Sequence, residues 1–247
     1  MVKIIGILNV TPDSFSDGGK FTETQRALRQ AEQLFAGGAH WVDVGAESTR
    51  PGADTISIES EWGRMADFWQ GVLASNTLDI KQFSLDTRNP ITAEKFLALG
   101  GEIINDVSGF QDENMINLAV KYRATCIVNH FPGRTINEVH EQNISSINVV
   151  KTDLENKVTQ MIEQGIEREK IIVDPGIGFG KTAALNEQLL TFALEVPSWP
   201  VLIGHSKKRF LGEDRLEKAV NVEAGEIAIA SGAAYLRVHE PDWYKNV

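Results

Sequence analysis

The sequence has little positive charge, one cysteine and no long apolar run. Its 24 Lys and Arg residues stand against 34 Asp and Glu, a formal net charge of −10. That balance argues against nucleic-acid and anionic-membrane partners, which need a basic face, but it is compatible with a small anion in a local basic pocket. No stretch approaches the roughly 18 apolar residues of a membrane helix, and the first apolar run is too short for a signal peptide. We therefore expect a cytoplasmic protein.

The single cysteine excludes an internal disulfide framework. Cys126 lies in the apolar run Thr125–Val128, where a thiol is typical of a hydrophobic core rather than of a nucleophile. A lone cysteine also fits the reducing cytoplasm.

Linkers and low-complexity segments are also missing. The 247 residues are 42% hydrophobic and 23% charged, which are ordinary values for a globular protein. No Pro/Gly/Ser-rich stretch and no shift in composition divides the chain, so we expect one domain over residues 1–247.

What the sequence does contain is a repeated alternation of short apolar runs and helical patterns. The apolar runs do not alternate cleanly with polar residues, which is typical of parallel strands buried on both faces. The predicted strands are Lys3–Leu8, Trp41–Val44, Gln82–Leu85, Glu102–Asn105, Thr125–Asn129, Lys170–Val173, Pro200–Ile203 and Tyr235–Val238. The predicted helices are Thr22–Phe35, Ile58–Ala74, Ile91–Leu99, Asn114–Tyr122, Ile147–Gln164, Ala184–Ala193 and Ala219–Ala230.

Eight strands alternating with helices in a chain of this length predict an α/β fold of the (β/α)8 TIM-barrel type. A doubly wound parallel sheet is the alternative. Only Glu240–Val247 follow the last predicted strand. We therefore expect the eighth outer helix to be missing or truncated.

Polar residues gather where the predicted strands end. A helix cap or a loop position explains each one singly. In a closed barrel, however, all of these ends face one cup, where barrel enzymes keep their active sites. The residues are Asn9, Asp43, Asp86, Asn105-Asp106, Asn129-His130, Asp174, Gly204–Ser206 and Arg237–His239.

The chemistry of this set suits a heterocycle that carries a polyanion. A carboxylate pairs with an amidine-like N–H edge in the bidentate geometry that Arg uses. Positive charge for phosphate comes from Arg50, Lys207–Arg209, Arg237 and His239. The glycine-rich stretch Asp174–Lys181 (DPGIGFGK) has neither P-loop nor GxGxxG spacing. We expect its glycines to let the backbone turn tightly over a flat ligand, with Phe179 beside it.

Two long motifs resemble a known family. Gly6–Gly19 (GILNVTPDSFSDGG) and Gly45–Gly52 (GAESTRPG) look like the first and second loops of dihydropteroate synthases. The remaining motifs of that family follow in order across nearly the whole chain: Ser84–Thr87, Ile103–Asp106, Asp174–Lys181, Ser206–Lys208 and Arg237–His239.

The resemblance implies a pterin-binding (β/α)8 barrel and a transferase of folate synthesis. Such enzymes condense 6-hydroxymethyl-7,8-dihydropterin pyrophosphate with p-aminobenzoate, giving 7,8-dihydropteroate and pyrophosphate, with Mg²⁺ as cofactor. It also implies a homodimer. The eighth helix, which belongs to the family's subunit contact, is the one without a full counterpart here.

The resemblance assigns roles residue by residue. It implies that Asp86, Asn105, Asp174 and Lys208 meet the pterin and that Arg237 and His239 meet the pyrophosphate, and together these six form the predicted catalytic set. Asn9 is the predicted metal contact. The predicted substrate-binding residues are Phe15, Thr49, Arg50, Pro51, Asn129, Phe179, Gly204, Ser206 and Arg209.

Two departures from the family pattern concern the second substrate. The family has Ser-Arg-Lys-Ser where this chain has Ser206–Arg209, so Arg209 replaces a serine expected near the p-aminobenzoate carboxylate. Its fifth strand ends in Met-His-Met-x-Gly, whereas this chain reads NHFPG over Asn129–Gly133. A pterin-binding paralogue without synthase activity is therefore the alternative, and a pterin-dependent methyltransferase module is a third reading.

Overall fold

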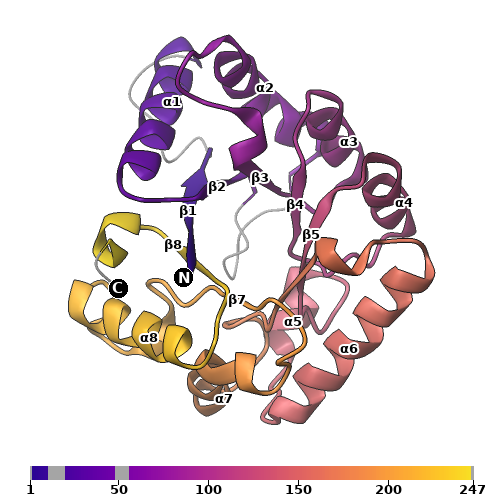
Figure 1. Ribbon diagram of the computed structural model, residues 1–247, viewed down its shortest axis with the longest axis vertical. Coiled ribbons are helices and arrows are strands. Elements are labelled where there is room, and N and C mark those ends of the chain that lie inside the picture. The colour runs from indigo at the N-terminus through magenta and orange to yellow at the C-terminus, as the bar shows by residue number, and fades with distance from the viewer. Residues whose placement is uncertain (1, 11–19, 48–55, 246–247) are drawn as a thin grey trace.

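The computed structural model describes residues 2–10, 20–47 and 56–245, and within them eight parallel strands form one sheet (Figure 1). Its strand order is β6-β5-β4-β3-β2-β1-β8-β7. The strands are β1 Lys3–Asn9, β2 Trp41–Gly45, β3 Phe83–Asp86, β4 Ile103–Asp106, β5 Thr125–Asn129, β6 Ile171–Asp174, β7 Leu202–Ile203 and β8 Tyr235–Val238.

The sheet closes into a barrel at a narrow seam. An isolated parallel bridge joins Val173 of β6 to Val201, just before β7, and the Val173 amide donates to the Pro200 carbonyl at 3.0 Å. Because β1 also pairs with β8, the first and last strands are neighbours. This confirms the predicted barrel and excludes the doubly wound alternative, in which two strands would remain as open edges.

Helices surround the strands on the outside (Figure 1). They are α1 Lys20–Ala36, α2 Ile58–Ala74, α3 Pro90–Ala98, α4 Glu113–Tyr122, α5 Ile136–Glu141, α6 Ile147–Glu163, α7 Ala183–Gln188 and α8 Lys218–Ala230. Short 3-10 turns are η2 Ile80–Gln82, η3 Arg168–Lys170, η4 Leu189–Leu194, η5 Arg209–Leu211 and η6 Pro241–Tyr244. All seven predicted helices are present, α5 is additional, and the predicted seventh helix splits into α7 and η4.

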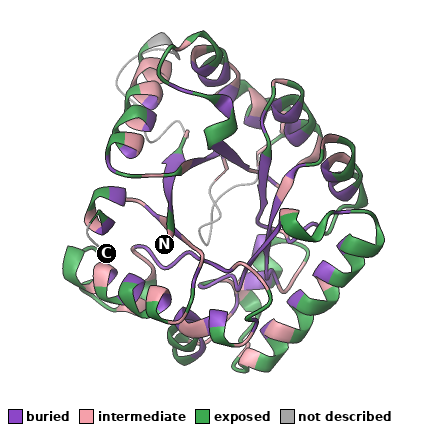
Figure 2. Cartoon of the chain, viewed as in Figure 1, coloured by how far each residue is buried: buried purple, intermediate pink, exposed green. Residues whose placement is uncertain are grey.

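The main core lies between the sheet and the helices. Buried residues line the strands and the inward faces of the helices, and exposed residues cover the outside (Figure 2). Trp69 of α2 packs edge-on against Phe83 of β3 and at a tilt against Phe96 of α3, with ring centroids 5.7 and 4.8 Å apart. Cys126 is fully buried in this core, as predicted from its apolar neighbours.

The barrel interior has an apolar floor and a polar layer above it. Ile5, Ile103, Ile127, Ile172 and Leu202 form a separate buried cluster, covered by Trp41 and Tyr235. Side chains two residues apart on a strand share a face. The next inward positions beyond this floor are therefore Ile7, Asp43, Asn105, Asn129, Asp174, Gly204 and Arg237, and five of these seven carry polar side chains.

Beyond β8, the helical element of the described residues is the four-residue turn η6. Its Tyr244 is buried and donates a hydrogen bond to the Asn221 carbonyl at 2.8 Å. Its ring lies so close to Gly225 of α8 that a Cβ there would be 2.5 Å from the ring. Within the described residues, the eighth outer helix is thus truncated to a short turn, as predicted, and the buried Tyr244 anchors this turn to α8. None of the described helices is both long and apolar enough to span a membrane.

Candidate active site

Asp43 on β2 is the centre of the polar layer. The residue is fully buried, and its carboxylate accepts hydrogen bonds from Ser84 Oγ at 2.6 Å and Asn105 Nδ2 at 2.9 Å. Arg237 Nε on β8 donates to the same carboxylate at 2.6 Å. Four strands thus meet at one acid, and three of them supply a donor to it.

Arg237 is held between two carboxylates. Besides the Asp43 contact, its Nη2 donates to Asp86 Oδ2 at 2.8 Å. A guanidinium has five N–H donors, so three remain beyond these two bonds for an anion that enters the cup. The predicted pyrophosphate ligand and the predicted pterin ligand Asp86 are therefore direct neighbours, which the sequence did not indicate.

Asp86 shares its surroundings with several other charges. Burial and repulsion by Asp43 raise the pKa of Asp86 to about 7, against the opposing pull of Arg237. Its side chain is 21% exposed, as expected for a group that faces the cup. A carboxylate with its pKa in the neutral range is typical of functional sites.

Two amides continue the polar layer onto β5. Asn129 Nδ2 donates to Asn105 Oδ1 at 2.8 Å, while Asn105 donates in turn to Asp43. Both amides are buried. This chain of bonds fixes which end of each amide is the donor, so a ligand meets one fixed pattern of donors and acceptors.

Asp174, which ends β6, and Lys208, which follows β7, continue the polar lining of the cup. Asp174 is buried and accepts the Gly176 amide at 2.7 Å. Lys208 Nζ donates to the Ile177 carbonyl and lies 5.6 Å from the centre of the Phe179 ring. Burial lowers the pKa of Lys208 to about 8 and raises that of Asp174, although each charge favours the other. A Cβ at Gly204 would lie 3.8 Å from both of their polar tips, so the structure brings these four predicted residues together.

Lys181 fastens the glycine-rich loop that follows β6. Its Nζ donates to the carbonyls of Gly176 and Phe179, both at 2.9 Å, and burial lowers its pKa to about 7. Gly176 has a φ of +67°, and a Cβ there would lie 2.2 Å from the His130 carbonyl. The loop therefore requires glycine at position 176 and the Lys181 amine as a central donor. Its course brings the Phe179 ring beside Lys208.

The cations of Lys207–Arg209 have different environments. Lys207 pairs with Glu240 at 2.8 Å, which makes it a local structural charge. Lys208 faces Asp174, as described above. Arg209 begins η5 and is exposed. Next to them, Ser206 Oγ lies 3.0 Å from His239 Nδ1, so these two predicted residues also meet.

Some predicted residues lie at the rim or outside the described part of the chain. Asn9 ends β1 and is exposed. Phe15, Thr49, Arg50 and Pro51 fall within 11–19 and 48–55, which the structure does not describe.

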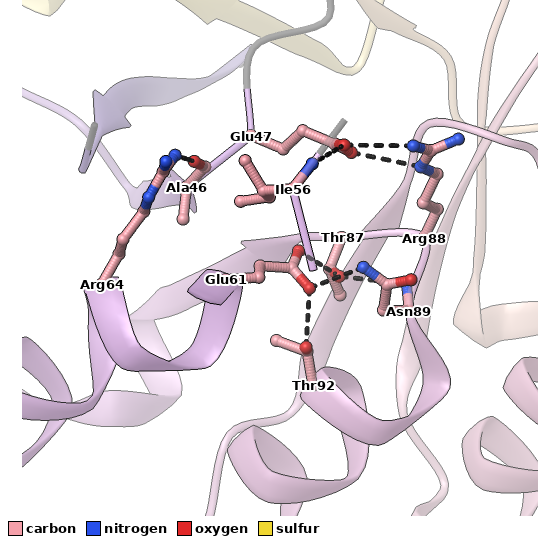
Figure 3. A network of polar contacts seen from close by, with 9 residues as sticks. All are labelled: Ala46, Glu47, Ile56, Glu61, Arg64, Thr87, Arg88, Asn89 and Thr92. Atoms are coloured by element: carbon pink, nitrogen blue, oxygen red, sulfur yellow. Dashed lines mark hydrogen bonds and ion pairs between the residues drawn. The ribbon is translucent and has the colours of Figure 1, made fainter. Parts of the chain in front are cut away.

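Beside the cup, a polar network joins α2 to the turn after β3 (Figure 3). Buried Glu61 accepts hydrogen bonds from Thr87, Asn89 and Thr92, and Glu47 pairs with Arg88. Sequence reasoning missed Glu61 as well as Asp43 and Lys181. Asp43 stood among the strand ends and Lys181 closed the glycine motif, but Glu61 is one of several acids in a helical pattern and carried no signal.

The arrangement so far is a polar cup in which a guanidinium lies between two carboxylates. The chain matches the family described as pterin binding enzyme over residues 5–239. It is 39% identical to the dihydropteroate synthase of Neisseria meningitidis serogroup C, over 96% of this chain and 87% of that protein. The chain belongs to the dihydropteroate synthase family.

Solved dihydropteroate synthases have the same fold. The Clostridium difficile enzyme, determined in the presence of pteroic acid, is 33% identical with a TM-score of 0.85, over 98% of this chain and 92% of that one. The Xanthomonas albilineans enzyme in complex with 7,8-dihydropteroate is 30% identical with a TM-score of 0.82, over 98% and 89%. The predicted family and fold are thus confirmed, and the function of a dihydropteroate synthase is supported over nearly the whole chain.

Proposed function

We propose that this protein condenses 6-hydroxymethyl-7,8-dihydropterin pyrophosphate with p-aminobenzoate, releasing 7,8-dihydropteroate and pyrophosphate in folate biosynthesis. The observation that carries the proposal is the polar layer of the barrel. Asp174 and Lys208 attract each other within this layer, and Arg237 lies between Asp43 and Asp86. This layer therefore combines hydrogen-bond partners for the edge of a pterin with a cation for the leaving pyrophosphate, within one cup.

The pterin is expected against the carboxylates and amides. Asp174 or Asp86 accepts from the N–H/NH₂ edge of the ring in the paired geometry that carboxylates favour. Asn105, with its amide orientation fixed from both sides, offers one further donor and one further acceptor. Lys208 donates to the ring acceptors as a compact charge, and Phe179 covers one face.

The reaction breaks the bond between the pterin methylene and the pyrophosphate oxygen. The bond's electron pair leaves with the pyrophosphate, and the aniline nitrogen of p-aminobenzoate forms the new C–N bond and loses a proton. Because negative charge develops on the leaving group, the donors of Arg237 and His239 should lower the barrier most. The aniline needs to be placed rather than activated.

We also propose Mg²⁺ as the cofactor. The described residues hold no cluster of three or more His, Cys, Asp or Glu that would form an all-protein site. Mg²⁺ often takes one or two protein oxygens and completes its shell with substrate phosphates and water. The amide oxygen of Asn9, exposed at the end of β1, fits that role. When bound, the ion would neutralise the pyrophosphate charge.

The decisive measurement is pyrophosphate release from the dihydropterin substrate, with and without p-aminobenzoate and Mg²⁺. We expect release that depends on both. Well-folded protein that binds the pterin without p-aminobenzoate-dependent release would instead be the non-catalytic paralogue, which the unusual Arg209 and Asn129–Gly133 segment favour.

Arg209 provides a finer test of the second-substrate site. An exposed guanidinium can pair with the carboxylate of p-aminobenzoate as the family's serine cannot. We expect Arg209→Ser to raise the KM for p-aminobenzoate about fivefold, within the range of a solvent-exposed ion pair, and to leave pterin affinity unchanged. An unchanged KM would show that this arginine does not contact the second substrate.

The cellular setting remains a proposal as well. We infer a cytoplasmic enzyme, since its single cysteine is buried and unpaired and cytoplasmic proteins keep their thiols reduced. A homodimer also remains a prediction from the family resemblance.

A further inference from the structure

Glu61 is a buried carboxylate whose three hydrogen-bond donors are all neutral (Figure 3). It lies in the first turn of α2 and is 1% exposed. Thr87 Oγ1 donates to it at 2.7 Å, Asn89 Nδ2 at 2.7 Å and Thr92 Oγ1 at 2.6 Å. All three donors belong to the turn that follows Asp86 or to the start of α3.

Glu61 lies at the start of α3 and binds side chains of its N-cap residue and first turn rather than its backbone N–H groups. Asn89 is the N-cap residue of α3, yet its side chain makes no capping bond to its own helix and donates to Glu61 instead. The unpaired N–H groups at a helix start favour a nearby negative charge. A buried charge is a costly way to stabilise a fold, because apolar packing usually does as well. The network is better explained by its effect on geometry, because it fixes the position of the turn that follows Asp86.

A second acid holds the same turn from the other side. Glu47 accepts Arg88 Nε at 3.1 Å and Nη2 at 3.0 Å, which is a bidentate pair. The same carboxylate accepts the Ile56 amide at 3.4 Å. Glu47 therefore links the chain after β2, the chain before α2 and the residue two positions beyond Asp86.

We propose that Glu61 and the Glu47–Arg88 pair are positioning residues for the active site. They hold the turn Thr87–Asn89 from two sides, so that Asp86 meets Arg237 and the pterin from one fixed direction. The backbone adds to this hold, because the Thr87 amide donates to the Asn105 carbonyl at 3.1 Å. The inference rests on the proposed function, since it assigns how the pterin-binding carboxylate is aimed.

The charge of Glu61 should affect the pH dependence of pterin binding, which a side chain that only fills space would leave unchanged. The groups that act on Asp86 are Asp43 from β2, Arg237 from β8, Glu61 from α2 and Asp106 from β4. Of these, the three acids raise the pKa of Asp86 and Arg237 lowers it. If the Asp86 carboxylate pairs with the pterin, affinity falls as pH drops through this pKa. Removing the charge of Glu61 should move that fall to lower pH.

The main test compares Glu61→Gln with Glu59→Gln, a neutralised acid at an exposed position of the same helical turn. Calorimetry measures the binding of 6-hydroxymethyl-7,8-dihydropterin from about pH 5.5 to 8.5. We expect Glu61→Gln to weaken binding about tenfold at the alkaline end, the effect of one lost charge-assisted hydrogen bond, and to move the acid limb to lower pH. Glu59→Gln should match the wild type. Unchanged affinity together with an unchanged acid limb in folded Glu61→Gln overturns the proposal.

A second set of variants decides the matter if Glu61→Gln does not fold. Glu47→Gln and Arg88→Gln are compared singly and together by the same pterin titration. If Glu47 and Arg88 act only as a pair, either single substitution already removes the whole effect of the pair on pterin affinity. The double variant should then bind the pterin no more weakly than the single variant with the lower affinity. Additive losses, or no loss at all, contradict the proposal.

These titrations measure binding without turnover. The proposed reaction and the proposed positioning role can therefore be refuted independently of each other. A wild-type protein that binds the pterin but shows no p-aminobenzoate-dependent pyrophosphate release refutes the proposed reaction and leaves the positioning role in place. Full activity with unaffected Glu61 and Glu47 variants refutes only the positioning role.

Discussion

At the scale of single residues, Asp174 is the strongest test of the pterin site. Its buried carboxylate faces Lys208 and is already oriented by the Gly176 amide. Asp174→Asn keeps the shape but replaces one acceptor with a donor that would oppose the pterin N–H edge. We expect pterin affinity to fall by a factor of about 100, as for a charged hydrogen bond lost in a buried site.

Calorimetric titration with the dihydropterin measures this loss. Asp67→Asn is the matched control, because Asp67 lies on the exposed side of α2. A folded Asp174→Asn protein that binds the pterin as the wild type does would show that Asp174 is not a pterin ligand.

The same residues predict a narrow pH optimum. The pKa of Asp86 is raised to about 7, so its carboxylate is lost as pH falls below that value. The pKa of Lys208 is lowered to about 8, so its ammonium is lost as pH rises above that value. If both charged forms are needed, kcat/KM should peak between about pH 7 and 8, since kcat/KM reports the ionisation of the free enzyme.

The basic side of this profile can be assigned with Lys208→Arg. Its guanidinium stays charged throughout the range, so the activity that remains should no longer fall above about pH 8. A basic limb that persists unchanged in this variant would belong to another group.

At the scale of elements, Lys181 decides whether the glycine-rich loop keeps its form. Replacing it with Met removes the donor shared by the Gly176 and Phe179 carbonyls. Unpaired buried carbonyls cost about 1 to 3 kcal/mol, so Lys181→Met should lower the free energy of unfolding by that amount in urea denaturation. Pterin affinity should fall with it, because Phe179 loses its support. Lys218→Met, at an exposed position of α8, should change neither quantity.

The elements themselves were largely readable from the sequence. Every predicted strand and helix exists, because short apolar runs and helical periodicity report burial directly. The departures have local causes. The strand predicted over Pro200–Ile203 shortens to Leu202–Ile203, since β6 pairs with this region only through one bridge. The short helix α5 escaped prediction because six residues give too little periodicity to recognise.

The site was predicted less completely, for a physical reason. Asn105, Asp174 and Lys208 follow from strand ends and motifs, and the structure places them in one cup. Contacts such as Arg237 with Asp43 join residues 194 positions apart, and only the closed barrel brings them together. Glu61 acts from a helix start, where an acid most often serves the helix dipole.

At the scale of the whole molecule, the seam between β6 and β7 is the weakest part of the barrel. The β1–β2 pair has five residues in register, whereas this seam has the single bridge from Val173 to Val201. Backbone amides exchange through local openings, and openings begin where few bonds hold. The Val173 amide, which donates to Pro200, should therefore exchange with solvent faster than the amides between β1 and β2.

The pterin should close this seam, because its predicted ligands lie on both sides of it. Asp174 ends β6, while Gly204 and Lys208 follow β7. A ligand at about 100 times its Kd stabilises the state that binds it by about 2.7 kcal/mol. Saturating dihydropterin should thus slow Val173 exchange by up to about 100-fold in hydrogen-exchange measurements. Pyrophosphate, whose predicted ligands Arg237 and His239 lie on β8 and just beyond it, should slow it less. Equal protection by both ligands would mean that the pterin does not bridge β6 and β7.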